Sequence, residues 1–284
     1  MKTTSRICRV NGVELHVSEA GPLDGPLAIF LHGFPDFWWG WRYQIEALSA
    51  QGFRVVAPDQ RGYGVSDKPR GTRAYDLDTL AADVIGLADF YGRKTFRLAG
   101  HDWGGIIAWH VAARYPARIE RLAVLNAPHP DAFLRFVRRH LRQALRSTYA
   151  AFFQLPWLPE MLLDAGRFAA LRRALVSSSR PGTFPDDDLE RYVEAWKQPG
   201  ALTAMLNYYR ALGRRSWTRP SRISVPTLLI WGLRDVFLEP GVARASLKLC
   251  DDAQSLFLET AGHWVQLEET GAVNTALVRF FGPL

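Results

Sequence analysis

Asp102 is the residue whose surroundings most clearly indicate chemistry. It lies in the segment Gly100–Gly105 (GHDWGG), directly after the apolar run Phe96–Ala99 and before a stretch with helical apolar spacing. This order predicts a strand, a sharp turn and a helix. Glycines at such a turn let the backbone and the helix approach closely, which leaves the central residue exposed in strained geometry. An aspartate beside glycines is also a common turn former, but the flanking strand and helix favour Asp102 as a nucleophile.

An aspartate at this position narrows the reaction that the site can carry out. The spacing resembles the G-x-S-x-G nucleophile elbow of α/β-hydrolases, with aspartate in place of serine. A carboxylate is ionised at neutral pH without help, because its reference pKa is about 3.9. Attack on an ester carbonyl would give a high-energy anhydride, so Asp102 suits a saturated electrophilic carbon, as in an epoxide or a carbon that bears a halide. The product of that attack is an ester on Asp102 itself.

Hydrolysis of such an ester needs a base that activates water and an acid that orients the base. His263, in the segment 261–264 (AGHW), follows the last predicted strand and is the candidate base. Asp235 follows the strand that ends at Trp231 and is the candidate acid, because the chain order nucleophile, acid, histidine is the one expected of this fold. Asp131, after the preceding strand, is a weaker alternative, and a cap on a helix is the other interpretation of Asp235.

Two backbone N–H groups are candidate donors to the oxyanion that forms during ester hydrolysis. They belong to Trp103, which follows the nucleophile, and to Phe34 in the segment 32–35 (HGFP). The Phe34-Pro35 bond is a candidate for the cis form. We expect His32 to shape this loop by hydrogen bonding and His101 to pack beneath the turn that carries Asp102.

Apolar segments alternate with helical patterns along most of the chain, which predicts an α/β fold with a mostly parallel central sheet and helices on both faces. The alternation stops after 127–130 (APHP), where a mostly helical stretch begins. We therefore expect an α/β-hydrolase core in residues 1–128 and 221–284, with an inserted helical cap in 129–220. The predicted strands lie at 7–10, 13–18, 27–31, 53–57, 96–99, 122–126, 226–231 and 255–258, the first two joined by the hairpin dipeptide Asn11-Gly12, and a final helix spans 265–281.

Polar residues follow several of these strands. In sheets of this kind the ligand crevice lies at the carboxyl ends of the strands. His32, Asp59, Asp102, Asp235 and His263 would all lie there, which predicts a single site.

Two tyrosines in the predicted cap are candidate proton donors. Opening an epoxide leaves an alkoxide, and a tyrosine hydroxyl is a suitable donor because it is neutral at pH 7. Tyr149 lies on an apolar helical stripe within 134–153 and Tyr209 on a second stripe within 202–212, whereas Tyr208 lies about 100° round the helix from Tyr209. Periodicity alone leaves a second interpretation open, in which both tyrosines are core aromatics whose hydroxyls find other partners.

Several further motifs are similar to those of the epoxide hydrolase branch of the α/β-hydrolase family, and the resemblance covers nearly the whole chain. In that family two cap tyrosines bind the epoxide oxygen, and the segments 147–154 and 206–210 resemble the two that carry them. The resemblance therefore implies that Tyr149 and Tyr209 donate to the epoxide oxygen. The motifs are 32–35 (HGFP) with Trp38, 41–44 (WRYQ), 59–64 (DQRGYG), 100–105 (GHDWGG), 262–264 (GHW) and the cap motif 152–157 (FFQLPW).

The sequence therefore predicts an epoxide hydrolase that converts a small apolar epoxide and water to a vicinal diol through an ester on Asp102. Neither a cofactor nor a metal is expected. The oligomeric state and the physiological epoxide stay open. The expected pocket walls are Trp103, Phe34, Phe152, Trp157 and Met205.

Two other functions stay open. A haloalkane or haloacid dehalogenase would use the same Asp102 nucleophile but needs halide-binding donors, for which Trp103 is a candidate. Against it, Phe34 occupies the position where many haloalkane dehalogenases resemble one another in having Asn or Glu, and Trp103 replaces the arginine that follows the nucleophile in fluoroacetate dehalogenases. A receptor that kept the fold and lost the chemistry is the second alternative, and an intact triad argues against it.

The composition limits the remaining classes. The net charge of +7 would suit nucleic acid, but the chain has no zinc-finger spacing, no RNP-like motif and no basic low-complexity tail. No stretch approaches the roughly 18 apolar residues of a membrane span, so we expect a soluble, cytoplasmic protein whose Cys8 and Cys250 are free thiols. A predicted basic helix face, either solvated or a docking site for an anionic partner, comprises Arg135, Arg138, Arg139, Arg142 and Arg146.

Overall fold

The computed structural model describes residues 3–212 and 222–282, and its described strands form one eight-stranded sheet in the order β1-β2-β4-β3-β5-β6-β7-β8. The hairpin β1–β2 and the β2–β4 pair are antiparallel, and every later pair is parallel. This topology confirms the predicted mostly parallel sheet. The strands are β1 Thr4–Val10, β2 Val13–Ala20, β3 Leu27–Leu31, β4 Arg54–Pro58, β5 Phe96–His101, β6 Ile119–Leu125, β7 Thr227–Gly232 and β8 Ala253–Leu258.

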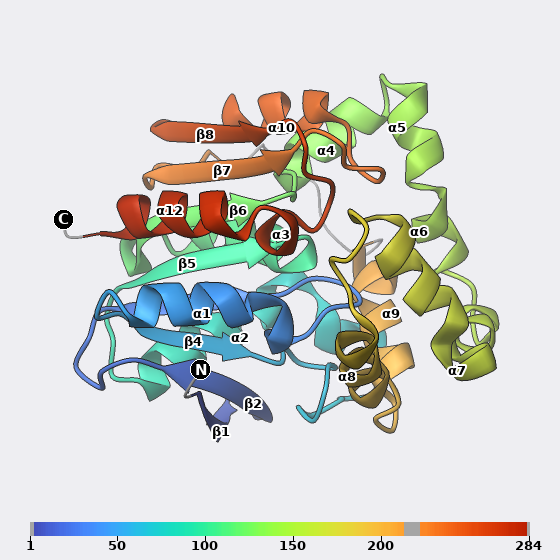
Figure 1. Cartoon of the computed structure of the whole chain (residues 1–284), viewed down its shortest axis with the longest axis horizontal. Helices are drawn as coiled ribbons and strands as arrows, with labels where there is room; N and C mark the ends of the chain where they lie inside the picture. Colours follow the sequence, from blue (N-terminus) through green and yellow to red (C-terminus); the bar gives the residue numbers. More distant parts are fainter. Residues whose placement is uncertain (1–2, 213–221, 283–284) are drawn as a thin grey trace.

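Helices cover both faces of the sheet, with α1 and α12 on one face and α2 and α3 on the other (Figure 1). Successive side chains of a strand point to opposite faces, so Phe30 of β3 packs against α1 and α12 while Ile29 packs in the core of the other face. The helices of the core are η1 Trp38–Trp41, α1 Arg42–Ser49, η2 Thr72–Tyr75, α2 Leu77–Phe90, α3 Trp103–Arg114, η3 Pro116–Arg118, α10 Pro240–Leu247, α11 Val265–Glu268 and α12 Thr270–Phe281.

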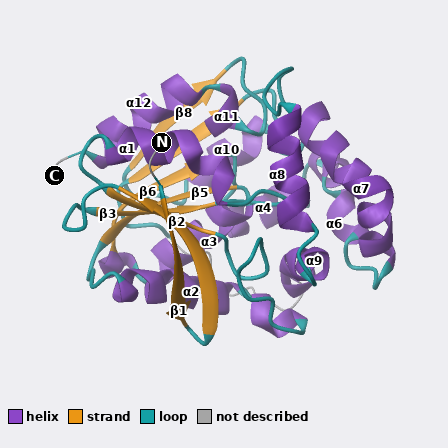
Figure 2. Cartoon of the chain, turned by 60° about the horizontal axis from the view of Figure 1, so that its bottom comes forward, coloured by secondary structure: helices purple, strands orange, loops and turns teal. Residues whose placement is uncertain are grey.

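Within the described residues, six helices lie between β6 and β7, and α5 to α9 stand beyond the carboxyl ends of the strands (Figures 1 and 2). The first of them, α4, lies against α10 of the core. These helices fall within the predicted cap 129–220, of which residues 213–220 lie outside the described part of the chain. Their bounds are α4 Pro130–Val137, α5 Leu141–Arg146, α6 Thr148–Phe152, α7 Leu158–Ser177, α8 Asp186–Trp196 and α9 Ala201–Ala211.

The single helix expected over 134–153 is wrong, because the chain forms the three short helices α4, α5 and α6 there. His140 has extended backbone angles (φ −128°, ψ 95°) and its ring stacks on Phe136. The buried Gln143 side chain donates to the carbonyl of Phe237 and accepts from the N–H of Glu239, which fixes α5 against that loop. The five arginines of the predicted basic face are therefore distributed over two helices and the connection between them.

The predicted final helix is also divided, because Glu269 has non-helical angles (φ −126°, ψ 48°) between α11 and α12. Other expectations are confirmed: Asn11 and Gly12 form the hairpin turn with positive φ, and both cysteines are free. Among the described residues, no helix is both long and apolar enough to span a bilayer.

Candidate active site

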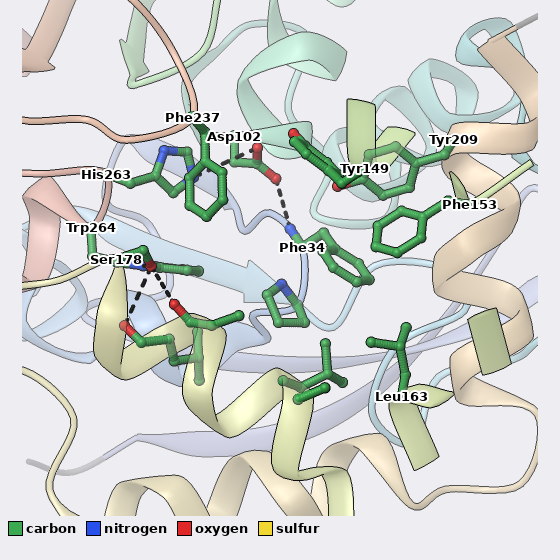
Figure 3. Close-up of a pocket in the computed structure, with 15 residues that line it drawn as sticks. Phe34, Asp102, Tyr149, Phe153, Leu163, Ser178, Tyr209, Phe237, His263 and Trp264 are labelled. Carbon is green, nitrogen blue, oxygen red and sulfur yellow. Dashed lines mark hydrogen bonds and ion pairs between the residues drawn. The ribbon is translucent and has the colours of Figure 1, made fainter. Parts of the chain in front are cut away.

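Asp102 stands at the junction between β5 and α3, in the strand–turn–helix arrangement that the sequence predicts. Its backbone has φ 50° and ψ −120°, an unusual conformation for a residue with a side chain. Gly104 makes this turn possible, because a Cβ at that position would overlap the carbonyl of Leu31. The turn aims the Asp102 side chain away from the sheet and into a pocket (Figure 3).

The two carboxylate oxygens of Asp102 have different surroundings. Oδ1 accepts a hydrogen bond of 2.8 Å from the backbone N–H of Phe34, and the N–H of Trp103 also binds the carboxylate. Oδ2 lies 3.7 Å from Nε2 of His263. Oδ1 is thus held by the N–H of Phe34, while Oδ2 faces the candidate base.

His263 is oriented by Asp235, whose Oδ2 lies 2.8 Å from Nδ1 of the imidazole. Asp235 is itself held by the side-chain amide of Asn126, at 2.7 Å, and by the N–H groups of Phe237 and Leu238. Asp131 lies at the start of α4 beside His129, 3.9 Å from its Nδ1. The structure therefore brings Asp235, and not the alternative acid, to His263.

Burial and neighbouring charges shift the pKa values of the triad residues in opposite directions. Burial alone would lower the pKa of His263, but attraction and a hydrogen bond from Asp235, together with the charge of Asp102, raise it above its ordinary value. Burial raises the pKa of Asp102, an effect opposed by His263 and by the two backbone N–H donors. The two carboxylates thus favour the protonated form of His263, while burial favours the neutral form of Asp102.

The other polar residues near the carboxyl ends of the strands hold the loops. His101 is fully buried and its Nε2 lies 2.9 Å from the carbonyl of His263. Nε2 of His32 accepts from the N–H of Gln60 at 3.0 Å. Asp59 accepts from the N–H of Trp38 at 3.1 Å. These three side chains fix the backbone around the triad.

Tyr149 of α6 and Tyr209 of α9 lie side by side, with ring centroids 6.0 Å apart, and Asp102 lies between them and His263 (Figure 3). Burial raises the pKa of each hydroxyl, and the charge of the nearby Asp102 raises both further. Both phenols are therefore neutral donors near neutral pH. Tyr208 differs, because its hydroxyl donates to the carbonyl of Arg61 in the core.

Hydrogen bonds join the two segments that carry these tyrosines. The side chain of Gln154 donates to the carbonyl of Tyr209 at 2.9 Å, and Arg210 donates to the carbonyl of Phe153 at 3.0 Å. Arg210 also pairs with Glu160 at the start of α7. The two hydroxyls are thus positioned by contacts within the cap.

The pocket between the triad and the cap has a volume of about 180 Å³. Its far wall is apolar and comes mainly from α7, which is broken by left-handed residues at Gly166, Arg167 and Phe168. The break divides α7 into two segments that both reach the pocket. The lining residues are Phe34, Pro35, Asp102, Tyr149, Phe153, Leu163, Ala170, Leu171, Ala174, Leu175, Ser178, Tyr209, Phe237, His263 and Trp264.

Comparison with known proteins agrees with this geometry. The family model described as alpha/beta hydrolase fold matches residues 26–270. The chain belongs to the α/β-hydrolase fold family. It is 45% identical over 271 residues to the AB hydrolase superfamily protein YfhM of Bacillus subtilis, covering 95% of each chain. It is 38% identical to human epoxide hydrolase 4, covering 95% of this chain and 76% of that protein.

Solved structures lead to the same group. A crystal structure of Bacillus megaterium epoxide hydrolase in complex with an inhibitor superposes with a TM-score of 0.89 at 32% identity, covering 97% of this chain and 99% of that one. An epoxide hydrolase from hot-environment metagenomes superposes with a TM-score of 0.89 at 35% identity, and each chain is fully covered. The chain is thus a member of the epoxide hydrolase branch of the α/β hydrolases.

In this α/β hydrolase, only one of the five expected wall residues lines the described pocket, namely Phe34. Trp103 lies behind the wall, with its ring centroid 5.0 Å from that of Tyr209. Met205 is buried elsewhere in the cap, and Trp157 is 69% exposed. Phe152 lies next to the pocket residue Phe153, which shares a helix face with Tyr149 because the two are four residues apart.

Helix α8 of this α/β hydrolase holds the loop that carries Phe34. The indole N–H of Trp196 donates to the carbonyl of Pro35 at 2.6 Å, and the hydroxyl of Tyr192 donates to Asp36 at 2.8 Å. The Phe34-Pro35 bond is cis, as predicted. Burial raises the pKa of Asp36 to about 7. Among the described residues, α8 therefore links the cap to a backbone donor of the site.

Asn126, Phe237 and the wall from α7 are site features that the sequence reasoning missed. Asn126 directly follows its strand, as Asp102 does, and has positive φ, so its place after a buried strand is a signal that the sequence offers. Phe237 lies two residues after Asp235, and its ring centroid is 5.0 Å from that of His263. The α7 wall depends on a helix break for which we find no sequence signal beyond Gly166.

Proposed function

We propose that this chain is an epoxide hydrolase, which adds water to an apolar epoxide to give a vicinal diol through an ester on Asp102. The observation that carries the proposal is the pair of tyrosine hydroxyls on the opposite side of Asp102 from His263 (Figure 3). Relatives and solved structures named epoxide hydrolases support it. The alternative dehalogenase needs halide-binding donors, and a neutral tyrosine pair suits an epoxide oxygen.

In the first step, Oδ2 of Asp102 attacks a ring carbon of the epoxide. The carbon–oxygen bond of the ring breaks as the bond to Oδ2 forms, and the ring oxygen takes a proton from Tyr149 or Tyr209. The raised pKa values of both tyrosines keep this proton in place until the alkoxide forms. The tyrosine recovers its proton from solvent after the step.

In the second step, His263 takes a proton from water, and the resulting hydroxide attacks the carbonyl carbon of the ester. Negative charge develops on Oδ1, which already accepts from Phe34. Asp235 stabilises the imidazolium. The bond from the carbonyl carbon to Oδ2 then breaks, and the diol leaves with Oδ2 and a proton from His263. The oxygen from water stays in the carboxyl group of Asp102, whose proton passes to solvent and balances the proton that the tyrosine took up.

The pocket supports an apolar substrate of modest size. Its α7 wall contributes Leu163, Leu171 and Leu175, and the hydroxyl of Ser178 is already engaged by Trp264 and by a carbonyl of α7. This wall therefore favours burial of an apolar substituent on the epoxide.

The direct test is product analysis on a panel of terminal, internal and fatty-acid epoxides, with a 1-chloroalkane assayed in parallel for halide release. Diol from at least one epoxide, absent in Asp102→Asn, is the expected result. Halide release without diol would replace the proposal with a dehalogenase. Tight binding of an epoxide without turnover would favour the receptor.

A further inference from the structure

Glu268, the last residue of α11, accepts hydrogen bonds from the backbone on both sides of His263. Its Oε2 accepts from the N–H of Gly262 at 2.8 Å, and its Oε1 accepts from the N–H of Trp264 at 3.1 Å. The carboxylate has no exposed surface, and the two backbone donors help to offset the cost of burying its charge. The mechanism proposed above gives this side chain no role.

The surrounding contacts fix the backbone of this loop. The imidazole of His263 is therefore the part of the loop that can change, through its protonation state. His101 binds the carbonyl of His263, and the indole N–H of Trp264 donates to Ser178 at 2.9 Å. A Cβ at Gly262 would lie 3.1 Å from Oε1 of Glu268 and 3.2 Å from the carbonyl oxygen of Ser178, so this residue packs tightly between them. The backbone from 262 to 264 is thus fixed from the core and from the end of α7.

We propose that Glu268 is a positioning residue that holds the His263 loop and supplies a negative charge behind the imidazole. Its two backbone hydrogen bonds set where Nε2 points, and its charge favours the imidazolium that forms when water is activated. It does not touch the substrate or the reacting atoms. The inference rests on the proposed function, because His263 acts only in ester hydrolysis.

The titratable groups that face His263 come from several elements, and three of them are carboxylates. Asp102 of the elbow and Asp235 after β7 lie within 3.7 and 2.8 Å of its ring nitrogens. His101 of β5 is held neutral by burial, which lowers its pKa far below the usual value. Glu268 acts from α11, with Arg180 behind it at 3.9 Å. Burial lowers the pKa of His263 and these carboxylates raise it, so loss of the Glu268 charge should lower that pKa.

Glu268→Gln tests both parts of the inference. An amide has one acceptor oxygen, and its NH₂ group would face a backbone N–H with nothing to accept. One of the two N–H groups beside His263 then stays unsatisfied in a buried loop. We expect ester hydrolysis to slow by roughly 10- to 100-fold. Formation of the ester should stay within about twofold, because Asp102 attacks without a base.

The pH profile separates this role from a purely structural one. Hydrolysis requires neutral His263, so its rate falls as the pH drops through the pKa of that residue. Glu268→Gln should move this acid limb to lower pH. Glu268→Asp keeps the charge on a shorter side chain, so it should slow hydrolysis while leaving the acid limb close to that of the wild type. If Glu268→Gln does not fold, the rate of ester hydrolysis in Glu268→Asp still tests the positioning role.

Glu269→Gln is the matched control. Glu269 is the next residue, is partly exposed, and pairs with the same Arg180 and with Thr260. Among the described contacts, it makes none with the backbone of 262–264. Its variant should therefore leave the hydrolysis rate and the acid limb unchanged.

The experiment is a single-turnover reaction of excess enzyme with styrene oxide, followed by rapid quench and mass measurement of the ester on the Asp102 peptide. The expected result is a longer-lived ester in Glu268→Gln than in wild type or Glu269→Gln, with the acid limb displaced. Equal ester lifetimes, or slowing with an unmoved acid limb, would overturn the inference. No ester in wild type or in His263→Gln would instead overturn the proposed function.

Discussion

The two halves of the site are held in different ways. Asp102 and Asp235 follow the parallel strands β5 and β7, and His263 lies on the loop after β8, so the register of the sheet brings the triad together. Tyr149 and Tyr209 stand on α6 and α9, which are joined by contacts inside the cap. The sheet thus supports ester hydrolysis, whereas cap contacts support epoxide opening, and the two steps should respond to different substitutions.

Loss of the nucleophile should affect both steps. Asp102→Asn removes the charged oxygen that attacks carbon, and we expect diol formation to fall by on the order of 10⁴-fold or more. The measurement is the initial rate of diol formation, with the melting temperature as a folding control. A folded variant that keeps more than about a tenth of the activity would contradict the assignment.

Removal of both tyrosine hydroxyls should affect only epoxide opening, which is the step that the cap supports. In Tyr149→Phe with Tyr209→Phe, the alkoxide loses its donors, so ester formation should slow by roughly 10²- to 10⁴-fold. Hydrolysis of an ester already formed should be nearly unchanged. Stopped-flow tryptophan fluorescence in single turnovers separates the two rates.

Tyr208→Phe is the control for these variants. Its hydroxyl binds the carbonyl of Arg61, so its loss should reduce the free energy of unfolding by about 1 kcal/mol and leave ester formation unchanged. If Tyr208→Phe slows ester formation as much as the double variant does, the pairing of Tyr149 with Tyr209 is wrong.

A substitution behind the triad should slow ester hydrolysis and leave ester formation unchanged, which is the reverse of the result expected for the tyrosine variants. Asn126→Ala removes a hydrogen bond to Asp235 and leaves the N–H of Gly232 without its partner. We expect hydrolysis of the ester to slow by about tenfold and ester formation to be unchanged. Equal slowing of both rates would mean that Asn126 supports the whole pocket and not the acid alone.

The smallest expected effect on activity concerns Asp36, which lies between the two halves and binds Tyr192 of α8. Its pKa in the folded protein is about 7, raised by burial from its ordinary value of 3.8. The folded state therefore favours the neutral acid, and this contribution to stability is present below the ordinary pKa and lost as the pH rises through 7.

The matched variant is Asp36→Asn, which is neutral at every pH. Its melting temperature should rise relative to that of the wild type by on the order of 10 °C between pH 4 and pH 8, since each unit of pKa difference corresponds to about 1.4 kcal/mol and each kcal/mol to about 2–4 °C. A difference between the two proteins that stays constant over this range would contradict the buried ionisation.

The sequence predicts the sheet half well because the relevant signals are local. Apolar runs predict the strands, and Asp102, Asp235 and His263 each follow one of them. Parallel strands share one carboxyl edge, so chain order alone predicts a common site. The same logic applies to Asn126, which also directly follows a strand.

The cap half is less predictable because its helices are short and irregular. Periodicity treats 134–153 as one helix, but His140 and Ser147 interrupt it. Tyr149 was assigned by resemblance and not by the helical stripe. The left-handed residues after Ala165 bend α7 towards the pocket, and helical spacing contains no information about that bend.

The central claim is a covalent ester on Asp102, and oxygen-18 labelling tests it most directly. Trypsin should release Leu98–Arg114, in which Asp102 is the only acidic side chain, and Asp235–Arg244 as an internal control. After one turnover with excess enzyme in oxygen-18 water, we predict one heavy oxygen in the first peptide, none in the second, and an unlabelled diol. A labelled diol with no label in Leu98–Arg114 would contradict the account, because water would then have attacked the epoxide directly.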